Sequence, residues 1–392
     1  MDIARLCSEL VRIRSENPPG DTEDVVHYLK GFTDRLGIRT TIVKNRGGRC
    51  NLVSTDPQGT LLLCGHVDVV PALGDGWTHR PDSGDVDGGY VWGRGATDMK
   101  GGCASLLDAC KTVADEGIDL SVDLAFVCDE ETSGKYGVRC LLERELLCPC
   151  DCLIAEPCPA LHPNIGQKGL LRVRFTFHGV PGHGSLYPLR GTSAIMEAYS
   201  LLEHLHRLHE REYSPGPDLL PLVTRSSEVL GEVFSLPQAG SALTRIMYNP
   251  GRIEGGEKAN IVAQRCCLEL ELRVPWGCST ELLLQDLRAA APGAEVVASS
   301  VADPSLTRPE ERIVRLTCRE ISRVYGATAE PIVQWAASDA RHLRGAGFRV
   351  IEYGPGEIQT LHAVDERVSI ENMEKVSQVY QGIIREYCSG KD

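Results

Sequence analysis

Leu61-Leu62-Leu63-Cys64-Gly65-His66-Val67-Asp68 is the stretch that decides the fold. It begins with a short apolar run, which is typical of a strand buried on both faces in a parallel sheet. Two further apolar runs, at residues 122–127 and 152–155, end at Asp129-Glu130-Glu131 and at Glu156. Helical patterns separate these predicted strands. The alternation of strands and helices predicts an α/β domain.

The length and the charge limit the class of protein. A chain of 392 residues exceeds the usual size of one domain, so we expect two. The net charge is −13, from 41 Lys and Arg against 54 Asp and Glu, and this acidic balance predicts no nucleic-acid partner. No apolar stretch reaches about 18 residues, which predicts no membrane span. Charged side chains interrupt the first fifteen positions, so we expect no signal peptide and a cytoplasmic protein.

The pattern of side chains changes near residue 169. Residues 171–177 alternate apolar and polar side chains, and residues 267–274 do the same. Such alternation is typical of antiparallel strands with one face exposed. It predicts a smaller α+β domain inserted into the α/β domain. The expected boundaries are 1–168 and 301–392 for the outer domain and 169–300 for the inserted one.

Polar residues gather at the ends of the predicted buried strands. His66 and Asp68 are two positions apart and therefore point to the same side of the chain. Three consecutive acids at 129–131 repel one another unless a cation neutralises them. Taken singly, each group has a plain structural explanation, such as a core histidine or an exposed acidic turn.

Together these residues form a set of nitrogen and oxygen ligands without a thiolate. Such a set suits two divalent metal ions, zinc most readily, with cobalt or manganese as alternatives. The glycine-rich segment 93–102 does not have the spacing of a phosphate-binding loop, which favours the metal interpretation. The candidate residues are His66, Asp98, Glu156, His362 and one of the acids at 129–131.

The ordered set of motifs resembles the M20 metallopeptidase family. These dinuclear zinc amidohydrolases include acetylornithine deacetylase, succinyl-diaminopimelate desuccinylase, aminoacylase and glutamate carboxypeptidase. The matching segments follow the family's order over nearly the whole chain. They are residues 15–20, 65–71, 93–102, 129–131, 155–157, 179–183, 259–262 and 361–366.

The resemblance implies a fold and a pair of metal sites. The fold would be a zinc-peptidase-like catalytic domain with a central mixed, mostly parallel sheet, and a ferredoxin-like inserted domain that serves as lid and dimer interface. His66, Asp98 and Glu156 would hold one metal ion. Asp98 would bridge to a second ion, completed by Glu131 and His362.

The resemblance also implies catalytic and substrate-binding roles. Asp68 would orient His66, and Glu130 would act as the general base on the attacking water. His183 would reach the active site of the partner in a homodimer and stabilise the oxyanion. Residues that would contact the substrate are Asn260, Arg273, Lys168, Arg341 and Gly354.

The expected activity is the metal-dependent hydrolysis of the amide bond of a small N-acyl amino acid. Succinyl-diaminopimelate desuccinylase and acetylornithine deacetylase are the favoured types, which would place the protein in lysine or arginine biosynthesis. A dipeptidase or aminopeptidase of the same family is an alternative, because it would use the same metal ligands. A non-catalytic metal-binding relative is a second alternative.

Sixteen cysteines are many for this chain. Without a secretion signal they predict reduced thiols rather than disulfides. Cys148, Cys150, Cys152 and Cys158 could bind zinc or an iron–sulfur cluster. However, Cys152 begins a predicted strand, so neighbouring side chains alternate away from one another, and we expect structural thiols.

Overall fold

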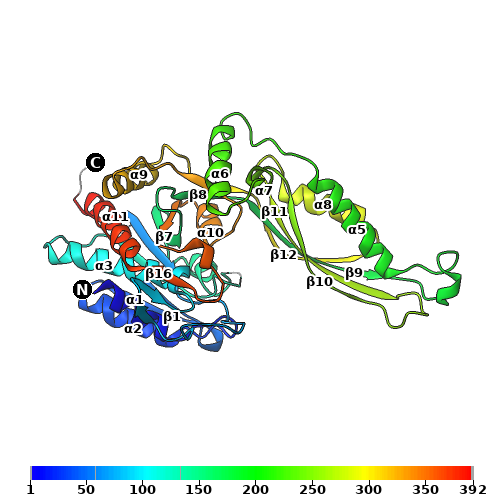
Figure 1. Cartoon of the computed structure of the whole chain (residues 1–392), viewed down its shortest axis with the longest axis horizontal. Coiled ribbons are helices and arrows are strands. Elements are labelled where there is room, and N and C mark those ends of the chain that lie inside the picture. Colours follow the sequence, from blue (N-terminus) through cyan, green and yellow to red (C-terminus); the bar gives the residue numbers. More distant parts are fainter. Residues whose placement is uncertain (1, 58, 133, 390–392) are drawn as a thin grey trace. The chain divides into compact units, whose positions relative to one another are not determined.

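The computed structural model describes residues 2–57, 59–132 and 134–389. The chain forms two compact units, which alternate along the sequence. The first unit consists of Met1–Ile165, Leu306–Ile332 and Ser338–Asp392. The second consists of Gly166–Ser305 and Val333–Ala337. The second unit is therefore an insertion into the first, and a five-residue segment returns to it later in the chain (Figure 1).

A mixed, mostly parallel sheet is the centre of the first unit. Its strands run in the order β1-β2-β6-β3-β7-β15-β8, and β6, β3, β7 and β15 are parallel neighbours. The sheet continues through β13 and β14 where the chain passes between the units. The strands are β1 Thr40–Lys44, β2 Cys50–Ser54, β3 Leu61–His66, β6 Asp123–Val127, β7 Asp151–Pro157, β8 Asn164–Gln167, β13 Ser305–Leu306, β14 Ile332–Gln334 and β15 Arg349–Gly354. This confirms the predicted α/β fold class.

Helices cover this sheet, as a parallel sheet requires. α3 packs against β3 and β7, and α11 packs along α3. Every residue of β3 and of β6 is buried, which explains why both strands are continuous apolar runs. The helices of this unit are α1 Ile3–Arg12, α2 Glu23–Arg35, α3 Gly101–Asp115, α4 Val138–Glu143, α9 Arg312–Tyr325, α10 Ala340–Gly345 and α11 Ile370–Cys388.

Gly102 allows α3 to lie directly on β7. A Cβ at this position would come within 2.2 Å of the main-chain oxygen of Ala155. Only a glycine fits such a close approach of helix and strand. The contact fixes the start of α3, and with it the segment that carries Asp98, beside the end of β7 that carries Glu156.

An antiparallel sheet of order β10-β11-β9-β12 is the centre of the second unit. α5 and α8 pack on one face of it, and Figure 1 shows both helices alongside these strands. Inward-facing residues such as Val173 and Leu268 join the core, while the alternate residues Arg172 and Glu269 do not. The elements are β9 Gly169–His178, α5 Ala194–His209, α6 Leu220–Val233, α7 Ala239–Thr244, β10 Met247–Gly255, β11 Arg265–Val274, α8 Thr280–Ala290 and β12 Glu295–Ala302.

A third, small sheet belongs to the first unit. Its order is β16-β5-β4, with β4 Asp85–Asp87, β5 Tyr90–Trp92 and β16 Arg367–Ser369. It connects the segment before Asp98 to the segment after His362, because β5 pairs with β16.

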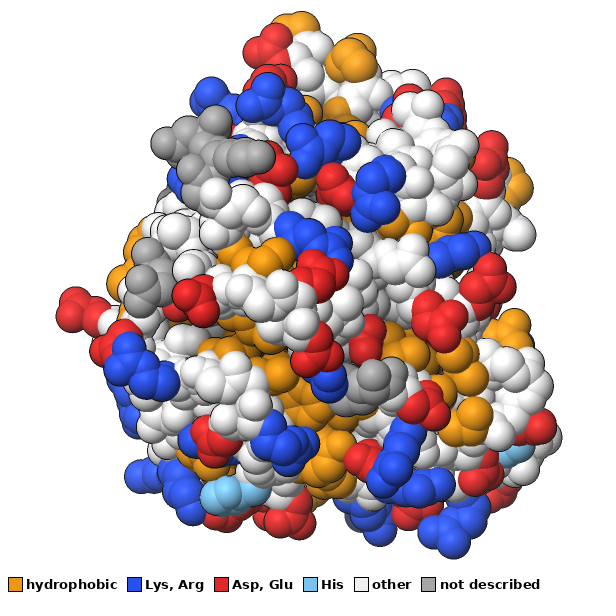
Figure 2. All heavy atoms as spheres, turned by 90° about the vertical axis from the view of Figure 1, so that its left-hand side faces the viewer, with side chains coloured by type: hydrophobic (Ala, Val, Ile, Leu, Met, Phe, Trp, Pro, Cys, Tyr) orange, Lys and Arg blue, Asp and Glu red, His pale blue; other side chains and the backbone are white. Residues whose placement is uncertain are grey.

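None of the described helices has the length and apolar character that a membrane span needs. Figure 2 shows acidic and basic side chains intermixed over the face of the molecule that it presents.

The sixteen cysteines all lie in the described ranges and are free thiols. Cys150, Cys152 and Cys158 are buried, whereas Cys148 is exposed. Burial raises the pKa of Cys150 to about 12 and the pKa of Cys158 well above its usual value, so these thiols are protonated at neutral pH. Within the described part of the chain, no group of side chains placed to hold a metal ion includes a cysteine.

Candidate metal centre

The carboxyl ends of three parallel strands place the predicted ligands at one edge of the sheet. His66 is the last residue of β3, and Glu156 is next to last in β7. The acidic turn at 129–131 directly follows β6. Because β6, β3 and β7 are adjacent and parallel, their carboxyl ends meet at the edge where α/β proteins bind ligands.

The five candidate ligands form two groups that share Asp98. In the first group, His66 Nε2 lies 3.0 Å from Asp98 Oδ1 and 3.9 Å from Glu156 Oε1. In the second, His362 Nε2 lies 3.2 Å from Asp98 Oδ2 and 3.4 Å from Glu131 Oε1. Within each group the ligand atoms all lie within 4.8 Å of one another. Asp98 thus presents one carboxylate oxygen to each group, which is the placement that a bridging ligand needs.

The electrostatics of this cluster favour a bound cation. Glu131 Oε1 is buried and lies 3.4 Å from His362 Nε2. Burial and the nearby Asp98 raise the pKa of Glu131, and burial raises the pKa of Glu156 well above its usual value. Hydrogen bonds to Asp98 and Glu131 raise the pKa of His362 to about 10. Such shifts arise when carboxylates crowd together without a counter-charge, and divalent cations would remove that cost.

Asp68 contacts His66 through its main-chain oxygen, whereas its carboxylate contacts other groups. His66 Nδ1 is 2.9 Å from the main-chain oxygen of Asp68, but 3.7 Å from its carboxylate. The main-chain carbonyl therefore orients the imidazole and leaves Nε2 facing Asp98. The carboxylate of Asp68 accepts hydrogen bonds from Asn17 Nδ2 at 2.8 Å and from the main-chain N–H of Glu130 at 3.2 Å. It anchors the acidic turn instead.

Asp129 is a second anchor of the acidic turn, and the sequence interpretation gave it no role. Its φ is +67°, a left-handed conformation that is uncommon for a residue other than glycine. Its carboxylate accepts hydrogen bonds from Thr132 Oγ1 at 2.6 Å, the Tyr136 N–H at 3.0 Å and Asn17 Nδ2 at 3.2 Å. These bonds hold the turn that carries Glu130. Asn17 lies in segment 15–20, so the motif gave a signal for its position but not for its function.

Glu130 lies at the centre of this charge cluster. Burial is the main cause that raises the pKa of its carboxyl well above the usual range, and Asp339 and Glu131 raise it further. The positive charges of His66 and Arg341 lower the same pKa. Arg341 Nη1 itself donates to the main-chain oxygen of Ser338 at 2.7 Å.

Two predicted substrate contacts have other roles in the structure. Lys168 is buried, and its Nζ donates to the main-chain oxygens of Ala242 at 2.7 Å and Arg245 at 2.5 Å. It therefore stabilises the end of α7 rather than offering a free cation. Gly354 is buried at the end of β15, where a Cβ would come within 2.1 Å of the Ala155 oxygen. Close packing of β15 on β7 explains this glycine.

The remaining predicted residues lie in the second unit. His183 is exposed, with Nδ1 2.8 Å from Ser185 Oγ. Asn260 is its neighbour, because the Asn260 main-chain oxygen accepts a hydrogen bond from the N–H of Gly184 at 2.9 Å. Arg273 Nη2 donates to Glu271 Oε1 at 2.6 Å on the same strand. The structure thus places the His183 segment beside the Asn260 segment, and the substrate contacts of all three residues stay predictions.

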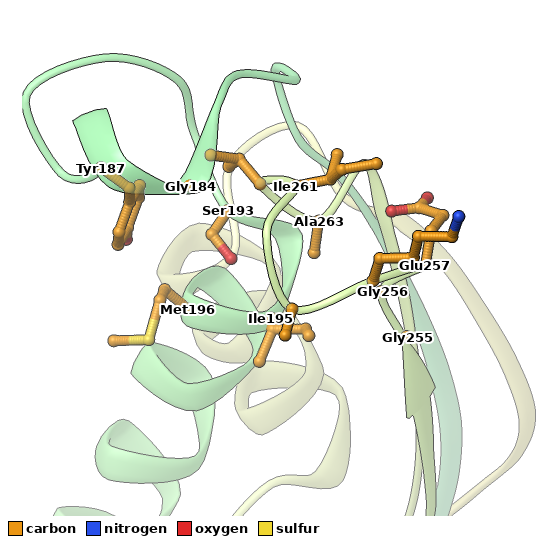
Figure 3. Close-up of a pocket in the computed structure, with 13 residues that line it drawn as sticks. Gly184, Tyr187, Ser193, Ile195, Met196, Gly255, Gly256, Glu257, Ile261 and Ala263 are labelled. Carbon is orange, nitrogen blue, oxygen red and sulfur yellow. The ribbon is translucent and has the colours of Figure 1, made fainter.

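A pocket of about 540 Å³ adjoins the His183 segment in the second unit. Figure 3 shows Tyr187 and Met196 on one side of it and Glu257 on the other, with Ile195 and Ile261 between them. Its lining is largely apolar and contains no candidate metal ligand. The sequence analysis did not predict this pocket, because its walls come from two segments about sixty residues apart.

Comparison with known proteins identifies the family. The model of peptidase family M20/M25/M40 matches residues 62–386, so the chain belongs to that family of metallohydrolases. It is 29% identical to the succinyl-diaminopimelate desuccinylase of Sulfurovum sp. (strain NBC37-1), with 100% of both chains covered. It is 26% identical to a probable carboxypeptidase S-like 2 of Dictyostelium discoideum, covering 83% of this chain and 71% of that protein. An M20 family metallo-carboxypeptidase from Sulfolobus solfataricus has a similar structure, with a TM-score of 0.80, 20% identity and coverage of 99% and 100%.

Proposed function

We propose that the protein hydrolyses the amide bond of an N-acyl amino acid with the help of two divalent metal ions. The observation that carries this proposal is Asp98, which presents one oxygen to each of two histidine–carboxylate groups. A site of this kind suits two cations of the zinc type. His66, Asp98 and Glu156 would hold the first ion, and Asp98, Glu131 and His362 the second. Zinc is the preferred metal, with cobalt or manganese as alternatives.

The bound cations would supply Lewis-acid activation of the carbonyl and of the attacking water. Glu130 would take the proton of that water and deliver it to the leaving nitrogen. The turn anchored by Asp68 and Asp129 holds this side chain in position. Arg341 would bind a carboxylate of the substrate by charge-assisted hydrogen bonds.

The second unit would complete the site in a homodimer. The partner subunit's His183 would donate a hydrogen bond to the oxyanion, and Asn260 and Arg273 would contact polar groups of the substrate. The exposure of His183 supports this role, because the side chain is free to meet another surface. Under this proposal residues 169–300 form the lid and dimer domain, and residues 1–168 with 301–392 form the catalytic domain.

N-succinyl-diaminopimelate and N-acetylornithine are the proposed substrate types. The name of the Sulfurovum relative supports the first of them, and lysine or arginine biosynthesis in the cytoplasm would be the setting. Peptide hydrolysis is the second candidate function, favoured by the names of the two carboxypeptidase relatives. The presence of Glu130 and of all five candidate ligands argues against a non-catalytic relative.

A hydrolysis screen tests this proposal. The zinc-loaded protein is assayed with N-succinyl-diaminopimelate, N-acetylornithine and simple dipeptides, and release of the free amine is measured. We expect turnover of one of the N-acyl amino acids, loss of activity with a chelator, and recovery with zinc or cobalt. Turnover of dipeptides alone would favour the peptidase alternative. Absence of turnover for every substrate would contradict the proposal.

A further inference from the structure

Glu366 is a buried carboxylate that the proposed chemistry does not use. It is 0% exposed and lies just after His362 in sequence. Its Oε1 accepts hydrogen bonds from the main-chain N–H groups of Thr97 and of Asp98, both at 3.1 Å. These two bonds fix the backbone at Asp98. The carboxylate of this residue belongs to both groups of candidate metal ligands. Glu366 therefore acts on the site through the main chain of another residue.

Arg94 is the partner of this carboxylate. Its side chain is 4% exposed, and its Nη1 lies 2.5 Å from Glu366 Oε2. Its Nη2 donates to the main-chain oxygen of His362 at 3.2 Å. The guanidinium also lies over the ring of Trp77, 5.3 Å from its centre. One side chain thus contacts both the carboxylate that holds Asp98 and the backbone of the second histidine.

The backbone of His362 needs such support. Its φ is +58°, which is unfavourable for a residue with a Cβ, and its side chain is 50% exposed. A residue held in a sparsely populated conformation keeps it only when its surroundings impose it. The bond from Arg94 is one such constraint. A second is the bond from the Gly93 N–H to the main-chain oxygen of Glu366 at 2.8 Å.

We propose that Arg94 and Glu366 are positioning residues that couple the two halves of the metal centre. They would set the separation of Asp98 and His362, so that both cations bind to a preformed site. Neither side chain touches the reacting atoms. The pair carries no net charge, and so it adds none to a cluster already crowded with carboxylates. This inference rests on the metal centre of the proposed function.

Metal titration tests the inference without any substrate. Chelator-stripped protein is titrated calorimetrically with zinc chloride, comparing wild type, Glu366→Gln and Arg94→Lys. Glutamine at position 366 keeps an oxygen that accepts from the two N–H groups, but its amide NH₂ then faces the guanidinium of Arg94. Lysine at position 94 keeps the positive charge but loses the two-pronged guanidinium that contacts both Glu366 and His362. We expect zinc to bind about 10–100-fold more weakly to both variants, the usual effect of losing such outer contacts.

Arg344 and Glu352 provide a matched control in the same unit. Their side chains are also 4% and 0% exposed, with Arg344 Nη2 3.3 Å from Glu352 Oε2. Arg344→Lys should lower the melting temperature to an extent similar to Arg94→Lys but leave zinc affinity unchanged. Circular dichroism checks that each variant is folded. If Glu366→Gln fails to fold, Arg94→Lys carries the test.

Three outcomes would overturn the inference. The first is wild-type zinc affinity and stoichiometry in folded Arg94→Lys. The second is an equal loss of zinc affinity in Arg344→Lys, which would indicate general loosening of the fold. The third is a wild-type protein that binds no zinc, which would also remove the proposed function. A wild type that binds two zinc ions but hydrolyses none of the screened amides contradicts only the proposed function.

Discussion

At the scale of single residues, the Asp and Glu carboxylates of the candidate site have different roles because their hydrogen-bond partners and burial differ. Asp68 and Asp129 are saturated with hydrogen bonds from N–H, amide and hydroxyl donors, so they shape the turn. Glu131 has a buried oxygen in the same group as Asp98 and His362, which suits it to bind a cation. Glu130 is half-buried beside other acids, and its raised pKa suits a group that accepts and returns a proton.

Substitution of Glu130 separates catalysis from metal binding. We predict that Glu130→Gln lowers kcat about 10²–10⁴-fold, because the amide cannot accept the proton. Zinc content should stay at the wild-type level, since Glu130 is not one of the five candidate ligands. The measurements are steady-state kinetics and metal analysis of the same sample. Glu143→Gln, at an exposed position at the end of α4, is the control, and near-normal turnover in Glu130→Gln would contradict the assigned role.

At the scale of elements, the site depends on strand ends and on one tight helix–strand contact. Three parallel strands deliver His66, the acidic turn and Glu156 to one edge of the sheet. Asp98 comes from the segment before α3, and the position of α3 is set by Gly102 against Ala155. His362 comes from the segment before β16, which pairs with β5. The candidate ligands thus come from strand ends and from the segments that lead into α3 and β16.

Two helical glycines make a matched pair for testing the α3 contact. We predict that Gly102→Ala lowers the melting temperature and weakens zinc binding, because its Cβ would lie 2.2 Å from a main-chain oxygen and push α3 off β7. Gly31→Ala in α2 has open space, its nearest atom being a flexible arginine end at 3.9 Å. It should stabilise the protein by about 0.5–1 kcal/mol. Equal effects of the two substitutions on thermal unfolding would contradict this account.

At the scale of the whole molecule, the protein divides its chemistry between two units. The first unit contains all five candidate ligands and Glu130. The second contains His183, Asn260 and Arg273 on an antiparallel scaffold with its own core. The proposed function joins the two through a homodimer, in which each active site takes its oxyanion donor from the other subunit.

Mixing two inactive variants tests whether sites are shared between subunits. We predict that His183→Ala lowers kcat about 10²–10³-fold, the usual effect of losing an oxyanion donor. After subunit exchange, an equal mixture of His183→Ala and Glu130→Gln should recover up to about a quarter of wild-type activity. This follows because half of the dimers then contain one complete site of their two. Activity that stays at the sum of the separate variants would contradict the shared site, and sedimentation analysis would show whether dimers formed.

The sequence by itself determined the fold class, the family and the types of ligand. Apolar runs define buried strands, and the polar residues that follow them must lie at the strand ends, so His66, Glu156 and one of the acids at 129–131 could be predicted from local pattern. The choice of Glu131, and the ligand roles of Asp98 and His362, came from the motifs that resemble the family. These predictions could be made from the sequence because they depend on residues close together in the chain or on the order of motifs.

Only the tertiary structure decided how the side chains are used. It showed that Asp68 orients His66 through its main-chain carbonyl, that Lys168 serves the end of α7, and that Gly354 is required by packing. It also brought Arg94 to Glu366 across 272 positions. No local pattern encodes such contacts, because the partner of a buried polar group is fixed by which elements pack together and not by its neighbours in sequence.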